Sequence, residues 1–136
     1  MRLAVALAVL SLTVATPAPV LAADWSALAG KLTKSVVYIE SAKGSCTGFV
    51  INDDVKGDKA YILTAAHCDG AKLYADGSDA HVIYKDAKSD LMVLEVDDLG
   101  RVAIALAKDD PKAGEEVMSF GYGYGFEQPM LRITHI

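Results

Sequence analysis

The chain lacks most of the features that mark nucleic-acid-binding, membrane-spanning and metal-binding proteins. Its 13 Lys and Arg residues are outnumbered by 18 Asp and Glu residues and form no cluster, so we expect no nucleic-acid partner. Its longest apolar stretch falls short of the ~20 residues that a membrane-spanning helix needs. The Cys-x-x-Cys and His-x-x-x-His pairs typical of zinc sites are missing, so we expect neither a metal site nor a cofactor.

The N-terminal segment 1–23 has the features of a secretory signal peptide in the usual order. Arg2 gives it a basic start, an apolar or hydroxyl run covers 3–15, two prolines follow, and Ala22 and Ala23 supply small residues for cleavage. An uncleaved membrane anchor is the alternative, which the prolines and the short apolar run disfavour. We therefore expect cleavage after Ala22 or Ala23, a secreted or periplasmic location, and no membrane contact apart from the signal peptide.

Cys46 and Cys68 are the only cysteines of the chain. An exported protein meets an oxidising compartment, so a disulfide between them is the expected state. Two alternatives stay open at this point. The pair could join a histidine in a metal site, although the usual ligand spacing is missing, or Cys68 could act as a nucleophile beside His67. Neighbouring residues of an extended strand point to opposite faces, which disfavours that dyad.

The residues after the signal peptide predict one short helix followed by short strands. Asp24 can cap a helix over 25–32, where Trp25, Leu28 and Leu32 recur at helical spacing. Apolar, aromatic or β-branched runs between Gly and Asp turns then predict strands over 35–40, 46–51, 60–65, 71–75, 81–84 and 91–96. A linker over 111–116 and strands over 117–120 and 130–134 follow. This regular spacing is typical of an all-β barrel or sandwich.

The segment Tyr61-Ile-Leu-Thr-Ala-Ala-His-Cys68 runs from an apolar strand directly into small residues, a histidine and a cysteine. A strand that holds one histidine at its end suits a general base, which must be rigidly placed. The segment closely resembles the catalytic-histidine segment of the trypsin/chymotrypsin-like serine peptidases, in which Thr-Ala-Ala-His-Cys recurs. The resemblance implies that His67 is the catalytic base. A buried structural histidine is the alternative.

Two further segments resemble the same family. Ser89-Asp-Leu-Met-Val-Leu-Glu-Val96 resembles its catalytic-aspartate segment. This implies that Asp90 accepts a hydrogen bond from Nδ1–H of the histidine and leaves Nε2 free to take the serine proton. Asp86 is the competing candidate for this role. Cys46-Thr-Gly-Phe-Val-Ile51 resembles the strand whose cysteine bridges to the one beside the catalytic histidine, which implies a Cys46–Cys68 disulfide.

The resemblance implies a chymotrypsin-like double barrel, of which the chain carries the first part. Residues 24–110 would form the first six-stranded antiparallel barrel, and residues 111–136 a linker and the first strands of an incomplete second barrel. No basic residue precedes an Ile/Val-Val-Gly-Gly activation site. The segments 35–39 and 114–121 are more similar to the bacterial HtrA/Deg-like branch, which implies an enzyme that is not activated by freeing a new N-terminus.

No serine of the chain lies in a Gly-Asp-Ser-Gly-Gly setting, and in this family the nucleophile comes from the second barrel. The sequence therefore predicts the N-terminal part of a serine endopeptidase that cleaves polypeptides with a Ser-His-Asp triad and is inactive alone. The main alternative is a catalytically dead first barrel kept as a binding or inhibitory module. A secreted metal-binding β protein is a third hypothesis. No feature predicts the oligomeric state.

Overall fold

The computed structural model describes residues 24–53, 58–97, 99–123 and 128–136. In this part of the chain one helix, α1 (Trp25–Leu32), precedes eight strands and a short 3-10 turn, η1 (Ala66–Cys68). The strands are β1 (Val36–Ser41), β2 (Gly44–Asp53), β3 (Lys59–Ala65), β4 (Leu73–Ala75), β5 (Ser78–Asp86), β6 (Leu91–Asp97), β7 (Glu116–Gly121) and β8 (Met130–His135). The predicted signal peptide, residues 1–23, lies outside the described residues.

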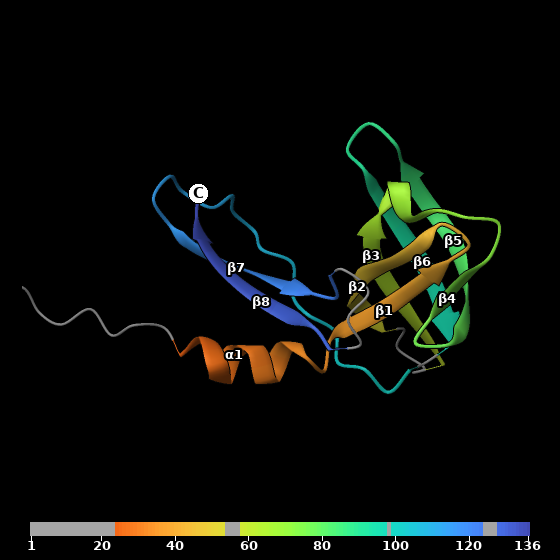
Figure 1. Cartoon of the computed structure of the whole chain (residues 1–136), viewed down its shortest axis with the longest axis horizontal. Helices are drawn as coiled ribbons and strands as arrows, with labels where there is room; N and C mark the ends of the chain where they lie inside the picture. The colour runs from red at the N-terminus through yellow and green to blue at the C-terminus, as the bar shows by residue number, and fades with distance from the viewer. Residues whose placement is uncertain (1–23, 54–57, 98, 124–127) are drawn as a thin grey trace, which may run out of the picture.

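The first six strands form a closed barrel in the order β1-β2-β3-β6-β5-β4, and pairing of β4 with β1 closes it. All of these pairs are antiparallel. Strands β3 and β6 are distant in sequence but pair along their whole length, from Lys59↔Asp97 to Ala65↔Leu91. Figure 1 shows this barrel with the β7–β8 hairpin beside it. The predicted all-β fold with a six-stranded antiparallel barrel is confirmed.

Alternation along the strands explains which side chains fill the barrel. In β6, Met92, Leu94 and Val96 are buried while the residues between them are partly exposed. Successive side chains of a strand point to opposite faces, so every second residue reaches the core. The largest fully buried side chains are Ile39, Ile62, Met92, Leu94, Val36, Val37, Val50 and Val96.

Several predicted strand boundaries differ from the structure, among them those of β4 and β5. Strand β4 begins at Leu73 rather than at 71, and β5 covers 78–86 rather than 81–84. The backbone φ angle is +48° at Asp76 and +84° at Gly77, and Ala75 pairs directly with Ser78. Positive φ at both central residues is the geometry of a two-residue hairpin turn, for which Asp-Gly is a favoured sequence. The two strands are therefore one tight hairpin.

Strands β7 and β8 form a separate two-stranded antiparallel sheet. Its end nearest the barrel is tied to β2, because Thr47 Oγ1 donates to the Tyr122 carbonyl (3.1 Å) and accepts from the Tyr122 amide (2.7 Å). The Tyr122 ring also packs edge-on against Tyr38, with ring centroids 5.1 Å apart. All six residues of β8 are exposed. This sheet has no second layer among the described residues.

Helix α1 begins at Trp25 because Asp24 caps it: Asp24 Oδ1 accepts a hydrogen bond from the Ala27 amide at 3.0 Å. Trp25 Nε1 donates to Glu116 Oε1 at 2.8 Å, which places the helix beside β7, as Figure 1 shows. No helix in the described ranges has the length and apolar character needed to cross a membrane.

Candidate active site

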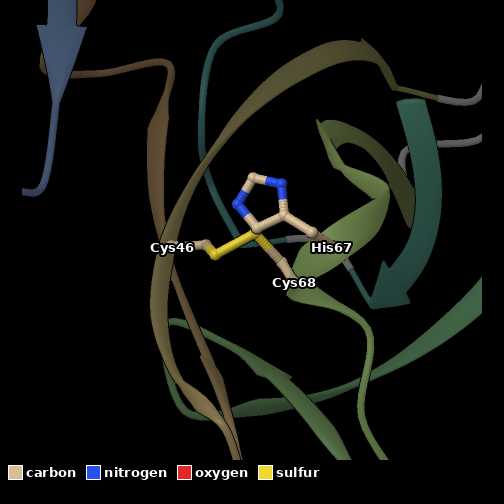
Figure 2. A group of neighbouring side chains, drawn as sticks. All are labelled: Cys46, His67 and Cys68. Carbon is tan, nitrogen blue, oxygen red and sulfur yellow. A yellow bond between two sulfur atoms is a disulfide. The ribbon is translucent and has the colours of Figure 1, made fainter. Parts of the chain in front are cut away.

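His67 sits on the turn that follows β3. The strand ends at Ala65, and residues 66–68 form the 3-10 turn η1. Ala66 and Cys68 are buried, whereas the side chain of His67 is 71% exposed. The predicted extended geometry at residues 67–68 is therefore wrong, because a 3-10 turn replaces it. The imidazole nevertheless lies beside the sulfur atoms of Cys46 and Cys68, as Figure 2 shows.

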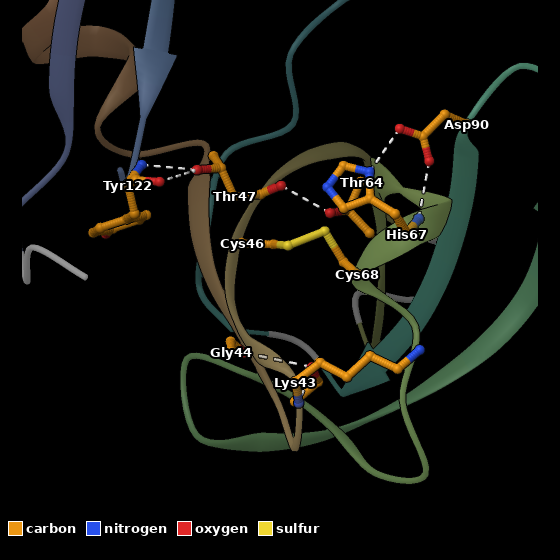
Figure 3. The surroundings of a disulfide bond; sticks show 10 residues. Lys43, Gly44, Cys46, Thr47, Thr64, His67, Cys68, Asp90 and Tyr122 are labelled. Atoms are coloured by element: carbon orange, nitrogen blue, oxygen red, sulfur yellow. Dashed lines mark hydrogen bonds and ion pairs between the residues drawn. A yellow bond between two sulfur atoms is a disulfide. The ribbon is translucent and has the colours of Figure 1, made fainter. Parts of the chain in front are cut away.

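The register of β3 against β6 brings Asp90 to this turn. Ala65 pairs with Leu91, so the residue after β3 lies opposite the residue before β6. The Ala66 amide donates to the Asp90 carbonyl at 3.1 Å. The Asp90 carboxylate contacts His67 twice, with the main-chain amide 2.9 Å from Oδ1 and Nδ1 2.7 Å from Oδ2, as Figure 3 shows. A carboxylate thus fixes both the backbone and the ring of the histidine.

The hydrogen bonds to Asp90 favour its ionised form. The bond from the His67 ring, followed by the bond from the His67 amide, holds the pKa of the Asp90 carboxyl below its ordinary value. An ionised carboxylate can only accept hydrogen bonds. In the neutral imidazole the ring proton therefore lies on Nδ1, and Nε2 has a free lone pair that can accept a proton.

Asp86, the competing candidate, has other partners. Its carboxylate accepts from Ser89 Oγ at 2.6 Å and from the Lys88 amide at 2.9 Å. These bonds, the one from Ser89 first, lower the pKa of Asp86. Asp86 therefore closes the turn between β5 and β6, and Asp90 is the carboxylate that reaches His67.

The predicted disulfide between Cys46 and Cys68 is present. It joins β2 to the turn that carries His67, across a sequence separation of 22 residues. Both sulfur atoms are bonded to each other and neither cysteine is free. The alternative in which Cys68 is a nucleophile is excluded in this state, because a disulfide sulfur has no thiolate to attack with.

The structure brings together a group that ligand spacing in the sequence did not predict. One nitrogen of the His67 ring and the sulfur atoms of Cys46 and Cys68 lie within 4.8 Å of one another, as Figure 2 shows. The sequence left a site of both cysteines and a histidine open as an alternative, and the fold brings Cys46 to the other two residues. While the disulfide is closed, the sulfurs offer no thiolate to a metal.

Two further side-chain contacts near the turn do not follow from the sequence motifs. Lys85 Nζ of β5 lies 2.6 Å from Asp69 Oδ2, and this hydrogen bond lowers the pKa of Asp69. Thr64 Oγ1 donates to the Thr47 carbonyl at 2.8 Å, which links β3 to β2 just before the turn. Neither pair is marked by sequence spacing. Together they hold both ends of η1 (Ala66–Cys68), hereafter the histidine turn.

The His67 ring bonds only to Asp90 among the described residues, and no serine hydroxyl is hydrogen-bonded to it. Ser89 bonds to Asp86, and Ser41 bonds to the Gly44 carbonyl. The site thus contains an exposed histidine whose ring is held by one carboxylate.

A family model described as lysyl endopeptidase, C-terminal domain, matches residues 11–106, about seven tenths of the chain. No curated protein sequence matches the chain.

Many solved structures superpose on the chain, and three examples show the degree of similarity. The serine endoprotease from Yersinia pestis does so with a TM-score of 0.68 and 22% identity, over 85% of this chain and 45% of that chain. An inactive serine-to-alanine mutant of Rv3671c from M. tuberculosis H37Rv has a TM-score of 0.64 and 28% identity, over 89% of this chain and 58% of that chain. Another inactive form of the Rv3671c protease has a TM-score of 0.59 and 28% identity, over 91% of this chain and 60% of that chain. The chain thus spans about half the length of these proteins.

Proposed function

The chain belongs to the family described as lysyl endopeptidase, C-terminal domain, and from this membership we propose that His67 and Asp90 are the base and the orienting acid of a Ser-His-Asp triad that hydrolyses peptide bonds. The observation that carries the proposal is the 2.7 Å contact between His67 Nδ1 and Asp90 Oδ2. It supports the role of each residue because it leaves Nε2 as the free nitrogen.

In the proposed reaction a serine hydroxyl oxygen attacks the carbonyl carbon of the scissile peptide while Nε2 of His67 takes the hydroxyl proton. The imidazolium then gives this proton to the departing amine nitrogen as the C–N bond breaks. Water repeats the sequence on the acyl-enzyme, with His67 again as base. Asp90 stays ionised throughout and stabilises the imidazolium.

We assign the serine to a second barrel whose first strands are β7 and β8. The support is the absence of a Gly-Asp-Ser-Gly-Gly setting from the 136 residues, together with the greater length of the solved serine endoprotease from Yersinia pestis, of which the chain spans 45%. In this family the oxyanion hole and the pocket that selects the substrate side chain belong to that barrel, so our proposal concerns the reaction class. The substrate is a polypeptide.

The exposed surface of the hairpin favours this function over a binding or inhibitory module that is complete as one barrel. Met130, Leu131 and Ile133 of β8 are exposed at 42%, 38% and 40%. An apolar surface of this kind marks an interface that another part of a protein covers. A self-sufficient module would carry polar side chains there.

We also propose export to the periplasm or the outside of the cell. The disulfide supports this location, since disulfides persist in oxidising compartments. The signal peptide over residues 1–23 stays a prediction, with cleavage after Ala22 or Ala23.

The proposal predicts that the 136-residue chain does not react with a serine-directed fluorophosphonate. In a protein that also carries the second barrel, His67→Ala should lower turnover by several orders of magnitude, because the serine loses its base. His81→Ala, on β5, is the matched control and should leave turnover unchanged. Labelling of the short chain, or near-normal turnover of the His67→Ala protein, would contradict the proposal.

A further inference from the structure

We propose that reduction of the Cys46–Cys68 disulfide turns the histidine turn into a Zn²⁺ site, with Cys46, Cys68 and Nε2 of His67 as ligands. In this state the metal would occupy the nitrogen that acts as base. His67 would then be a base while the disulfide is closed and a metal ligand after the disulfide is reduced. The inference that zinc binds does not depend on the proposed peptidase function. The inference that zinc removes the catalytic base does rest on that function.

The positions of the donor atoms support a metal site. The His67 ring nitrogen and the two sulfurs already lie within 4.8 Å of one another. A tetrahedral zinc with Zn–S bonds of ~2.3 Å holds its two sulfurs about 3.8 Å apart. The Cα atoms of the two cysteines are 6.2 Å apart, so the sulfurs can reach this separation by side-chain rotation once the bond between them is broken.

Asp90 prepares the histidine for a metal. A histidine that binds zinc usually donates its other ring N–H to a carboxylate, which fixes the tautomer and makes the ligating nitrogen more basic. Here Asp90 Oδ2 holds Nδ1 at 2.7 Å. Figure 3 shows the other ring nitrogen on the side of the ring nearer Cys46. The pair that orients a base would orient a zinc ligand equally well.

The scaffold keeps the three ligands together after reduction. Two main-chain hydrogen bonds hold the turn to Asp90, from the amides of Ala66 (3.1 Å) and His67 (2.9 Å). The Asp69–Lys85 ion pair, at 2.6 Å, holds its far end. None of these contacts involves the sulfurs, so they persist when the disulfide opens.

Metal and solvent can reach the site from the histidine side. The His67 side chain is 71% exposed, whereas Cys68 is 4% exposed and lies at the edge of the core. Three protein ligands leave the fourth tetrahedral position to water. The site is therefore buried on the side of the sulfurs and open to water on the side of His67. Such a site can bind and release zinc reversibly.

The chemistry needs a reductant, which we take to be a phosphine or a dithiol. With a phosphine, the S–S bond breaks, two thiols form, and water supplies the oxygen of the phosphine oxide. Zn²⁺ then replaces the two thiol protons and forms two Zn–S bonds and one Zn–N bond. Oxidation of the thiolates by a disulfide oxidant closes the S–S bond and releases the metal. In the metal-bound state Nε2 has no free lone pair, so it cannot accept the serine proton.

The test is zinc binding by the 136-residue chain under argon, before and after reduction with a phosphine, with a chromophoric zinc indicator as competitor. We expect one equivalent bound by the reduced protein and none by the oxidised protein. Co²⁺ in place of Zn²⁺ should show the thiolate charge-transfer and tetrahedral absorption bands of a site with two sulfur ligands. Absence of binding by the reduced protein would overturn the proposal.

Variants separate a built site from two thiols that bind metal without the fold. His67→Ala should weaken zinc binding, and Asp90→Asn should weaken it by about 10–100-fold, as loss of the carboxylate behind a ligating histidine does. His81→Ala should not change it. Equal affinities for the wild type, His67→Ala and Asp90→Asn would overturn the proposal, and so would unfolding of the reduced metal-free protein by circular dichroism.

Discussion

At the scale of single residues, Asp90 combines an unusual backbone with two hydrogen bonds to His67. Its φ angle is +55°, in the left-handed region that a residue other than glycine rarely adopts. Aspartate tolerates this region better than most residues because its short side chain bonds locally. The cost is offset by contacts of the carboxylate with the amide and the ring of one residue. An aspartate at this position therefore tolerates the left-handed backbone and also holds the amide and the ring of His67.

The lowered pKa of Asp90 predicts a pH-dependent effect of Asp90→Asn on stability. Above the ordinary aspartate pKa of ~3.9 the carboxylate is ionised in the folded and the unfolded chain, and its bonds contribute fully. As pH falls through that value and then through the lower folded pKa, the contribution is lost. The stability difference between wild type and Asp90→Asn, from urea unfolding, should thus be largest near neutral pH and shrink in acid.

Asp79→Asn is the control for that experiment, because Asp79 is exposed on β5 and makes no side-chain hydrogen bond among the described residues. Its effect on stability should be small at every pH. A difference for Asp90→Asn that stayed constant from neutral pH to pH ~2 would contradict the assigned bonds.

Gly48 offers a second prediction at this scale, because a β-carbon there would collide with Ile62, which is fully buried. Overpacking of a filled core costs about 1–3 kcal/mol, so Gly48→Ala should lower the urea midpoint. Gly30, inside α1, has open space around it, and Gly30→Ala should raise stability by about 0.5–1 kcal/mol. Equal effects of the two changes would show that the packing at Gly48 is not as described.

At the scale of elements, the histidine turn is short but held by three strands. The disulfide ties it to β2, Asp90 ties it to the start of β6, and Lys85 ties it to β5. A 3-10 turn has poor internal hydrogen bonds and rarely holds a fixed shape alone. The neighbouring strands therefore supply the rigidity that the proposed base needs.

The junction between β2 and β7 rests on the Thr47 hydroxyl, which has two bonds to Tyr122. Gly121 fits there because any β-carbon would meet the Thr47 side chain. Thr47→Val keeps the shape and removes the hydroxyl, which should cost about 1 kcal/mol locally. We expect the Tyr122 amide to exchange with deuterium about fivefold faster, by NMR, and the barrel amides to be unchanged.

Thr47→Ser keeps the hydroxyl and is the matched control, so its Tyr122 amide should exchange like the wild type. Unchanged exchange in Thr47→Val would mean that this bond does not hold the hairpin to the barrel.

At the scale of the whole molecule, a closed barrel and an open hairpin differ in how they satisfy their backbone. The barrel closes through β4 and β1, so it has no edge along those strands. The hairpin has two strands only, and two-stranded sheets are marginally stable by themselves. Its exposed apolar side chains and open edges make it the part of the molecule that needs a partner.

This contrast predicts that the isolated chain self-associates through β8. The double variant Leu131→Thr with Ile133→Thr should reduce concentration-dependent association, measured by light scattering or sedimentation, because it removes apolar surface next to an open edge. Leu106→Thr removes an exposed apolar side chain outside the hairpin, 62% exposed, and should have little effect. Equal effects would place the association elsewhere.

The fold class and the family can be read from the sequence alone. Strand alternation, turn residues and one capped helix follow from local chemistry, because side chains alternate along a strand and Asp and Gly favour turns. The disulfide was predicted from cysteine count and export, and the family from the motifs around His67, Asp90 and Cys46. These signals lie in short stretches of chain, where neighbours in sequence are neighbours in space.

Most contacts between side chains of different strands depend on the tertiary structure. Pairing of β3 with β6 selected Asp90 over Asp86 as the partner of His67. Closure of the barrel brought Lys85 to Asp69 and placed Cys46 within reach of the histidine. The physical reason is that strand register, set by core packing along the whole length of both strands, fixes side chains that no local pattern relates.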